Sequence, residues 1–427
     1  MASHLTIAVR VLVVLAAVAG LCKLGATLAA FSATTDNSGS TFTAAASFDC
    51  PATVSPLWLT GFEHGGSILT SGGGIFDALT GAPTADSAVK NHGAYSLQVL
   101  DADAAAAING AKTTTATSSF VTRFAIRLDS LPVSDVTELA RVNAAAGNDL
   151  QLGYDAATQK LRLALGTTAT PVATVTADTT ISAATWYVID LRLATSTTTR
   201  TGSWRIDGAA QTDVTNTEAA SSSSELSFGS TIVADLFTAN YDDVKVTATA
   251  ADYPLAYGRI LKLSPNSLGT PLDTTHFADA GDSTPVEAGD WALLDDLPLR
   301  GSGIGPLLDG IKQNVTGATN YLEVNFANTA ETCITGAWAL GAGFTTQVPA
   351  AQAKLSIFDG ATQRVIHNGT WPASTTQAVR SAAVLPASSP WTTATLNALV
   401  ARFGYSSDAT NGPTVNGLML EYEVGMR

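Results

Sequence analysis

Cysteine is scarce in this chain of 427 residues, which contains three: Cys22, Cys50 and Cys333. Three cysteines exclude the dense disulfide framework of small secreted domains and the paired spacing of a zinc cluster. Cys22 lies in a segment that we expect to be removed on export. Cys50 and Cys333 either form a disulfide bond in an oxidising compartment or stay as two thiols, and the sequence favours neither alternative.

Positive charge is scarce as well, because 22 Lys and Arg face 36 Asp and Glu, for a formal net charge of -14. A chain this acidic repels phosphate backbones and anionic lipids, so we expect no nucleic-acid partner. The acidity is typical of a solubilising surface. The alternative, that some of the carboxylates bind calcium outside the cell, is left open.

Catalytic motifs are also missing. The sequence contains no G-x-S-x-G turn of a serine hydrolase, no G-x-x-x-x-G-K-[ST] phosphate loop and no E-x-D-x-x-E glucanase signature. The five histidines lie in leader or loop sequence, where we expect solvent-exposed side chains: His4, His64, His92, His276 and His367. We therefore expect no enzyme activity, with a glycoside hydrolase of unrecognised site as an alternative.

The N-terminus has the pattern of a secretory leader. Arg10 precedes an apolar run from Val11 to Cys22, which Lys23 interrupts. The run is too short for a comfortable membrane span and matches the apolar region of a signal peptide. We predict a signal peptide over 1–29, a linker or edge strand over 30–56, and no stable membrane span after cleavage. An uncleaved N-terminal anchor is the alternative.

Residues 57–250 alternate apolar and polar side chains in many short runs, which predicts an antiparallel β-sandwich. The clearest run is the hairpin from Trp186 to Gly208. One face of its first strand carries Tyr187, Ile189, Leu191 and Leu193, and Trp204 and Ile206 continue that face in the second strand. The other face carries Asp190, Arg192, Arg205 and Asp207, which we expect to pair across the strands in solvent.

Residues 251–427 show the same alternation and predict a second antiparallel sandwich. Its last strand alternates Leu418, Leu420, Tyr422 and Val424 with Glu421 and Glu423. One helix is expected after Pro390, because Leu396, Leu399, Val400 and Phe403 have helical spacing and Gly404 follows as a C-terminal cap. The sequence thus predicts an all-β protein with two jelly-roll domains, 57–250 and 251–427, the second with a short α-helix.

Two resemblances to known families follow from local motifs. Residues 25–32 and 35–42, GATLAAFS and TDNSGSTF, resemble the leaders of camelysin and TasA-type secreted proteins. Across 57–250, the runs GFEHG, HGAYSLQV, TWYVIDLRL, WRIDG and YDDVKV resemble, in their order, the concanavalin A-like or laminin-G-like jelly roll. The first resemblance implies export and association with the cell envelope, and the second implies a lectin-like domain.

The lectin-like resemblance also implies candidate site residues. In many sandwiches of this class, an acidic residue on the first strand meets one on the last, and a structural calcium ion ties them together. Glu63 and the pair Asp242–Asp243 match those positions. Because adjacent side chains of a strand point to opposite faces, we expect only one of the two aspartates to join Glu63.

Trp186 is the candidate ligand-binding residue. It lies on the opposite parity from the core face, so we expect it at an exposed rim, where an indole can stack on a sugar ring. We expect a secreted or cell-surface protein without catalytic activity that binds carbohydrate or the cell envelope. The alternative is a structural subunit of an extracellular filament or virion-type appendage, and a homo-oligomer is left open.

Overall fold

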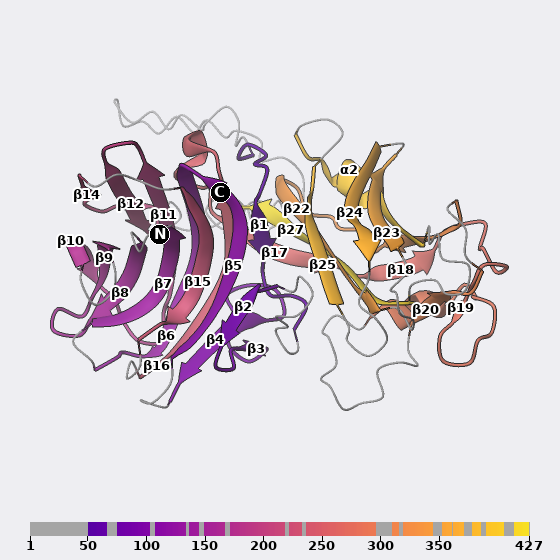
Figure 1. Cartoon of the computed structure of the whole chain (residues 1–427), viewed down its shortest axis with the longest axis horizontal. Coiled ribbons are helices and arrows are strands. Elements are labelled where there is room, and N and C mark those ends of the chain that lie inside the picture. Colours follow the sequence, from indigo (N-terminus) through magenta and orange to yellow (C-terminus); the bar gives the residue numbers. More distant parts are fainter. Residues whose placement is uncertain are drawn as a thin grey trace, which may run out of the picture. The chain divides into compact units, whose positions relative to one another are not determined.

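A computed structural model of the protein describes residues 50–65, 75–102, 107–133, 136–144, 149–166, 171–217, 222–232, 236–295, 310–315, 319–344, 352–360, 362–370, 378–385, 390–404 and 414–426. The predicted signal peptide and the predicted linker up to residue 49 lie outside these residues. Residues 50–427 form one compact unit, built from two β-sandwiches (Figure 1). The predicted all-β fold is confirmed.

The first sandwich consists of two antiparallel sheets. Nine described strands form one of them, in the order β13 (Ala209–Ala210), β12 (Arg200–Ile206), β11 (Trp186–Thr195), β6 (Ser119–Ser130), β16 (Phe237–Thr247), β4 (Ser96–Asp101) and β3 (Thr84–Asp86), with β1 (Trp58–Thr60) pairing with β16 and β14 (Val214–Asn216) with β12. Seven form the other, in the order β10 (Pro171–Thr180), β9 (Lys160–Gly166), β8 (Leu150–Asp155), β7 (Val136–Ala144), β15 (Ser223–Ser230), β5 (Ile108–Thr117) and β2 (Ala78–Thr80).

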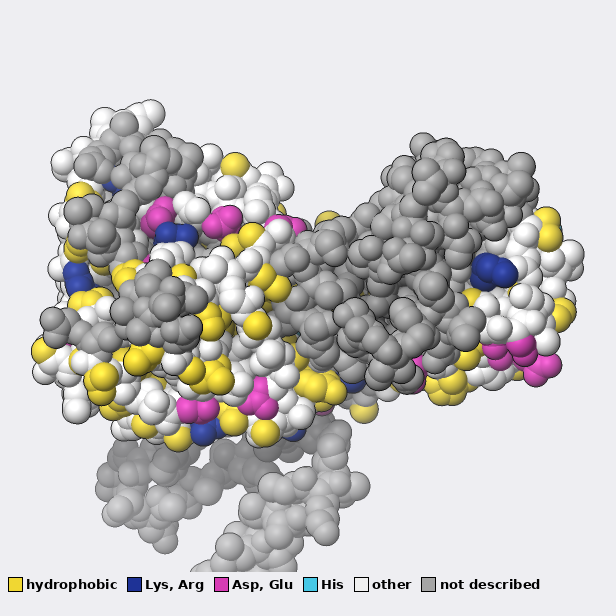
Figure 2. All heavy atoms as spheres, turned by 60° about the horizontal axis from the view of Figure 1, so that its bottom comes forward, with side chains coloured by type: hydrophobic (Ala, Val, Ile, Leu, Met, Phe, Trp, Pro, Cys, Tyr) yellow, Lys and Arg dark blue, Asp and Glu magenta, His cyan; other side chains and the backbone are white. Residues whose placement is uncertain are grey.

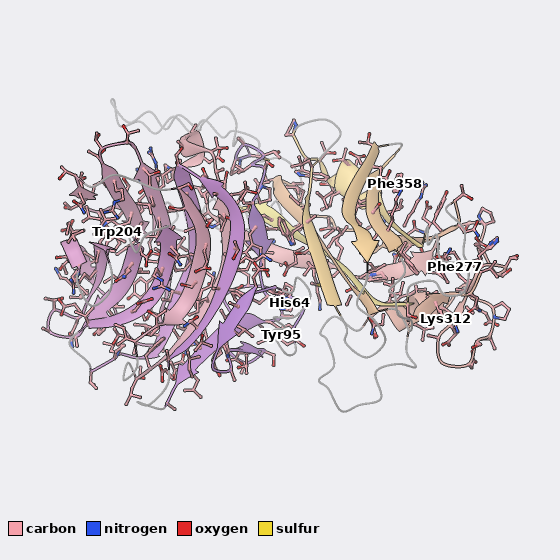
Figure 3. The ribbon with its side chains drawn as sticks, in the orientation of Figure 1. His64, Tyr95, Trp204, Phe277, Lys312 and Phe358 are labelled. Atoms are coloured by element: carbon pink, nitrogen blue, oxygen red, sulfur yellow. A yellow bond between two sulfur atoms is a disulfide. The ribbon has the colours of Figure 1, made fainter. Side chains whose placement is uncertain are left out.

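Alternation of side chains along these strands explains the first core. The predicted hairpin is present: β11 and β12 pair with Leu191 opposite Trp204 and Asp190 opposite Arg205. Ile189, Leu191 and Trp204 are buried in the core between the sheets, as their parity predicted (Figure 3). The inward face of β11 therefore supports the core, and its outward face is available for other contacts.

The second sandwich also has two antiparallel sheets. Six described strands form one: β19 (Phe277–Asp279), β20 (Ile311–Gln313), β27 (Thr414–Gly425), β22 (Ile334–Phe344) and β25 (Ala378–Val384), with β17 (Gly258–Leu263) pairing with β27. Five form the other: β18 (Pro265–Leu268), β21 (Tyr321–Phe326), β26 (Leu399–Gly404), β23 (Gln352–Asp359) and β24 (Thr362–Thr370). Two 3₁₀ turns, η1 (Ala250–Asp252) and η2 (Asp290–Leu294), complete the described elements together with the helix α2 (Thr393–Asn397).

The helix predicted after Pro390 is shorter than expected. α2 spans Thr393–Asn397, with a capping box between Thr392 and Thr395, and the chain continues directly into strand β26. The prediction over Leu399–Gly404 was wrong because Leu399, Ala401 and Phe403 also fit a period of two and fill the second core as a strand. Pairing of β26 with β21 and β23 outweighed the helical spacing.

One face of β22 and β27 packs against the first sandwich. Trp338 and Leu340 of β22 and Met419 of β27 belong to the same buried cluster as the core of the first sandwich. The glutamates on that face, Glu421 and Glu423, have exposed fractions of 0% and 1%. Their alternation with apolar residues therefore marks a face that is buried in the junction.

Glu423 lies at the centre of a buried ionic network in this junction. Arg123 Nη2 of β6 lies 2.6 Å from Glu423 Oε1, and Lys245 of β16 pairs with Oε2. The three side chains are almost completely buried. Although burial alone would raise the pKa of Glu423, the charges of Lys245 and Arg123 lower it to about 2.

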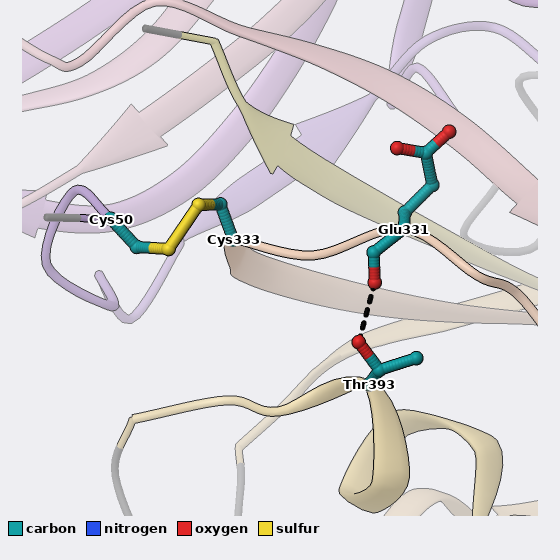
Figure 4. The surroundings of a disulfide bond; sticks show 4 residues. All are labelled: Cys50, Glu331, Cys333 and Thr393. Carbon is teal, nitrogen blue, oxygen red and sulfur yellow. Dashed lines mark hydrogen bonds between the residues drawn. A yellow bond between two sulfur atoms is a disulfide. The ribbon is translucent and has the colours of Figure 1, made fainter. Parts of the chain in front are cut away.

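A disulfide bond joins the start of this compact unit to the second sandwich. Cys50 and Cys333 are bonded, across a sequence separation of 283 residues (Figure 4). The N–H of Val54 also donates to the carbonyl of Thr335, and that of Leu57 to Val246. Segment 50–57 therefore connects both sandwiches. None of the helices in the described part of the chain is long and apolar enough to cross a membrane.

Candidate binding groove

The outward face of the nine-stranded sheet carries a groove with a volume of about 450 Å³, here called the Trp186 groove. Its floor comes from β11 and β12, and one wall comes from the connector 253–257 that leads into the second sandwich. Aromatic and charged side chains line it together, among them Trp186, Asp190, Arg205, Asp207, Tyr257 and Asn91. A groove of this size and composition suits a small polar ligand.

Trp186 is the predicted ligand-binding residue, and the structure places it in this groove. It begins β11 opposite Arg127 of β6, on the face away from Ile189 and Leu191. The indole is half-buried, whereas Trp58, Trp204, Trp338 and Trp391 are buried in the cores. Parity along one strand thus identified a tryptophan that is outside the cores and beside a groove.

Asp190 lies deeper in the same groove. Its exposed fraction is 4%, and its Oδ1 atom has no hydrogen-bond partner. Burial raises the pKa of Asp190 to about 6, against the opposing effects of Arg123, Arg205 and a hydrogen bond from the Leu255 N–H. This oxygen is an unsatisfied acceptor at the base of the groove, and a ligand hydroxyl reaches it only when the groups around it shift.

The prediction that Asp190 pairs with its neighbours on a solvated face was therefore half right. It does lie opposite Arg205, in register. The face is not solvated there, because Leu255 of the connector crosses it and covers the carboxylate. Three of the four hairpin charges that parity assigned to solvent, Asp190, Arg205 and Asp207, line the groove instead.

The turn at Asp207–Gly208 fixes the rim of the groove. Asp207 and Gly208 both have positive φ, 48° and 78°, as required by the Asp-Gly turns of tight hairpins. Val188 and Asp207 exchange two hydrogen bonds, Asp207 N–H to the Val188 carbonyl and Val188 N–H to Asp207 Oδ1, each of 2.8 Å. Arg205 Nη1 donates to the Gly208 carbonyl at 2.9 Å. The rim is thus held by one backbone hydrogen bond and by the side chains of Asp207 and Arg205.

The opposite wall is held by Asn91. Its Nδ2 donates to Asp243 Oδ2 at 2.9 Å and lies 3.3 Å from the Tyr257 hydroxyl. Sequence analysis missed Asn91 and Tyr257, which come from segments far from the hairpin. The sequence did contain one feature that could have indicated Tyr257: the connector carries two tyrosines, Tyr253 and Tyr257, on either side of Pro254.

The three residues predicted to bind calcium all hold the loop 91–95. Glu63 accepts hydrogen bonds from Ala94 N–H at 2.9 Å, and Asp242 Oδ2 accepts from Asn91 N–H and His92 N–H. Asp243 Oδ2 lies 2.6 Å from His92 Nδ1. The three carboxylates therefore hold the loop 91–95 directly, through hydrogen bonds from its N–H groups and the contact with His92.

The premise that Asp242 and Asp243 point to opposite faces, from which we expected only one of them to join Glu63, does not hold here. A β-bulge between Asp242 and Lys245, with Asp243 at φ 52°, breaks the alternation and turns both carboxylates toward residues 91–92. Within the described ranges, no group of three or more His, Cys, Asp or Glu side chains is arranged to hold a metal ion. Calcium binding by these residues stays a prediction, which a calcium titration followed by thermal unfolding would decide.

The histidines differ from the expectation of exposed loop residues. His64 is buried, with both ring nitrogens unbonded, and burial lowers its pKa to about 3. His367 belongs to strand β24, and His4 lies outside the described residues. His92 and His276 are in loops as predicted, each beside an aspartate. No catalytic histidine can be assigned from these positions.

Comparison with known proteins gives weak similarities only. No protein-family model matches the chain, and neither does any curated protein. A solved structure of the cellulose-induced protein Cip1 is 18% identical, with 39% of this chain and 86% of that chain covered and a TM-score of 0.33. Domain 4 of the extracellular arabinanase AbnA from Geobacillus stearothermophilus, solved with arabinotriose, is 11% identical, with 45% and 92% covered and a TM-score of 0.33.

A sialidase also matches, at 13% identity, with 47% of this chain but only 19% of that chain covered and a TM-score of 0.31. The chain thus spans a small part of that enzyme. At these TM-scores the similarities carry no argument about function. Any functional inference therefore depends on the residues that line the Trp186 groove.

Proposed function

We propose that this protein is a non-catalytic carbohydrate-binding protein of the cell exterior, with the Trp186 groove as its binding site. The observation that carries the proposal is the pairing of the half-buried Trp186 with Asp190, whose buried Oδ1 has no partner. A sugar presents an apolar C–H face and hydroxyl donors at once, which matches these two groups.

The other lining groups support the same ligand class. Arg205 can donate to sugar oxygens, and Tyr257 adds a second aromatic side chain to the wall formed by the connector. Asp207 Oδ1 is already used to hold the turn. A glycosidase needs two available carboxylates, and the engagement of Asp207 supports a binding role for the groove.

An exterior location fits the covalent structure. The Cys50–Cys333 disulfide is stable in an oxidising compartment and uncommon in a reducing one. The signal-peptide pattern over 1–29 supports the same location. Acidic side chains on the face shown in Figure 2 lie in small separate groups, as on a solubilising surface.

A glycan array probed with the full chain tests this function. We expect hits for the wild type and a loss of roughly 10- to 100-fold in affinity for Trp186→Ala, since removal of a stacked indole costs about 1.4–2.8 kcal/mol on this scale. Trp186→Phe is the matched control, because it keeps a ring in the groove and should retain most of the binding. A blank array for the folded wild type would contradict the proposal. Release of reducing sugar from a bound glycan, abolished by Asp190→Asn, would replace it by an enzyme.

A further inference from the structure

A second cleft lies in the second sandwich, between the loop Gly269–Asp273 and the start of β21. Its volume is about 370 Å³, and its lining includes Thr270, Asp273, Thr319, Tyr321 and Glu323. None of its lining residues is basic, so its chemistry does not suit an anion. It combines one aromatic side chain with hydroxyls and carboxylates, and it shares with the Trp186 groove the pairing of an aromatic ring with carboxylates.

Tyr321 is held in a fixed position at this cleft. The guanidinium of Arg402 lies 4.6 Å from the centre of the Tyr321 ring and 4.1 Å from that of Phe358, on neighbouring strands of the five-stranded sheet. Arg402 Nε also donates to Glu323 Oε2 at 2.8 Å. The cation thus covers one face of the tyrosine ring and fixes the adjacent carboxylate. Figure 3 labels Phe358 in the second sandwich.

The opposite wall of the cleft is equally fixed. The Gly269 N–H donates to the Glu323 carbonyl at 2.7 Å, and a Cβ at residue 269 would lie 2.6 Å from the Cβ of Glu323. Only glycine allows this close approach of the loop to β21. Asp273 Oδ1 lies 2.7 Å from His276 Nδ1. A cleft with fixed walls loses little conformational entropy when a ligand binds.

We propose that this cleft is a second carbohydrate-binding site, which takes a neutral sugar against Tyr321. The sugar is neutral because the cleft has no basic lining residue to bind an acidic sugar, and the Glu323 carboxylate is already paired with Arg402. This inference rests on the proposed function and adds a second, independent site to it. A polysaccharide that engaged both sites would be held more tightly than by either alone, by roughly 100-fold or more.

Isothermal titration calorimetry with cellohexaose, chitohexaose, xylohexaose and arabinohexaose tests the two sites separately. Six proteins are compared: the wild type, Trp186→Ala, Tyr321→Ala, the double variant of these two, Tyr321→Phe and Thr319→Arg. We expect two hexasaccharides per wild-type chain, one for each single variant and none for the double variant. Tyr321→Phe should keep both sites, because it retains the ring over Arg402. Thr319→Arg, at an exposed lining position, should block the cleft without disturbing the packing of Tyr321.

The outcomes separate the two proposals. If Tyr321→Ala and Thr319→Arg bind like the wild type while Trp186→Ala binds nothing, the second site is overturned and the proposed function stands. If Trp186→Ala binds like the wild type while Tyr321→Ala binds nothing, the second site stands and the Trp186 groove is overturned. No binding of any probe by the folded wild type, or unchanged binding by the double variant, overturns both.

Discussion

At the residue scale, Asp190 is the most informative side chain of the molecule. Leaving a buried carboxylate oxygen without a hydrogen-bond partner costs about 1–3 kcal/mol, and Asp190 Oδ1 is in that position. Arg123 and Arg205 compensate part of this cost through their charges. Asp190 therefore carries a free-energy cost in the ligand-free protein, and a ligand that donates a hydrogen bond to Oδ1 would remove part of that cost.

The raised pKa of Asp190 predicts pH-dependent binding. The ionised carboxylate is the better acceptor for a sugar hydroxyl, so affinity should fall as the pH drops through about 6. A loss of roughly 10-fold is expected, because a hydrogen bond to a charged group contributes about 1.5–3 kcal/mol. Titrations of the strongest array glycan between pH 4.5 and 8 check this. Asp190→Asn should bind more weakly and without that dependence, and parallel profiles for the two proteins would refute the assignment.

At the element scale, β27 joins the two cores through its two faces. Its apolar residues fill the second core, whereas Met419, Glu421 and Glu423 face the first sandwich. Removing one member of a buried ion pair leaves the others without compensation. Arg123 and Lys245 both depend on Glu423 for this compensation.

Glu423→Gln should therefore lower the free energy of unfolding by about 3–5 kcal/mol. Glu331→Gln is the matched control, because the Arg259–Glu331 pair has a similar distance, 2.7 Å, with both side chains about one-third exposed. The control should change stability by less than about 1 kcal/mol. Urea unfolding of the three proteins gives the comparison. Equal losses in the two variants would show that the buried network adds no stability.

The sequence predicted an element correctly where the spacing of its apolar residues fitted only a helix or only a strand. The hairpin β11–β12 was predicted in register because its alternation is strict and its turn is polar. Leu396–Phe403 fitted both a helix and a strand, and the neighbouring strands decided between them. Trp186 was found by parity. Asp190 was missed because Leu255, which buries it, belongs to the connector and leaves no local signal in β11.

At the scale of the whole molecule, buried carboxylates make stability depend on pH. Burial raises the pKa of Glu63 to about 7 and that of Glu421 to about 8. The charge of Asp243 raises the pKa of Glu63 further, and the charge of Glu63 raises that of Glu421. Both therefore hold protons in the folded state that the unfolded chain releases near pH 4.5. Glu423 has the opposite effect, since its folded pKa of about 2 favours folding above the unfolded value.

The stability should therefore rise from pH 2 to about 4.5 and then fall by several kcal/mol between about pH 4.5 and 8, at about 1.4 kcal/mol per pH unit for each carboxylate. The lowered pKa of His64, about 3, offsets part of this fall below pH 6.5, because the unfolded chain protonates this histidine first. Thermal unfolding across pH 3–9 measures this profile. Glu421→Gln should reduce the fall in stability above pH 4.5, because an amide carries no charge at any pH in this range. Its carbonyl can still accept from the Thr60 hydroxyl and the Gly61 N–H. A profile of the variant with the same slope as the wild type would count against Glu421 as the cause.

The disulfide stabilises the same compact unit by a different route. Cys50–Cys333 closes a long loop of the unfolded chain, so its removal should lower the free energy of unfolding by about 2–4 kcal/mol. Urea unfolding of Cys333→Ser, compared with the wild type with and without reductant, gives the measurement. Reductant should destabilise the wild type and leave the variant unchanged. An equal effect of reductant on both would point to another cause.

The connector 253–257 has a consequence for how this protein can evolve. Leu255 and Tyr257 form a wall of the Trp186 groove, and Gly258 already begins the second sandwich. A gene fusion that transferred only the first sandwich to another protein would carry Trp186 and Asp190 without the wall that covers them. A transferred fragment therefore has to extend through Tyr257 to keep every lining residue of the groove.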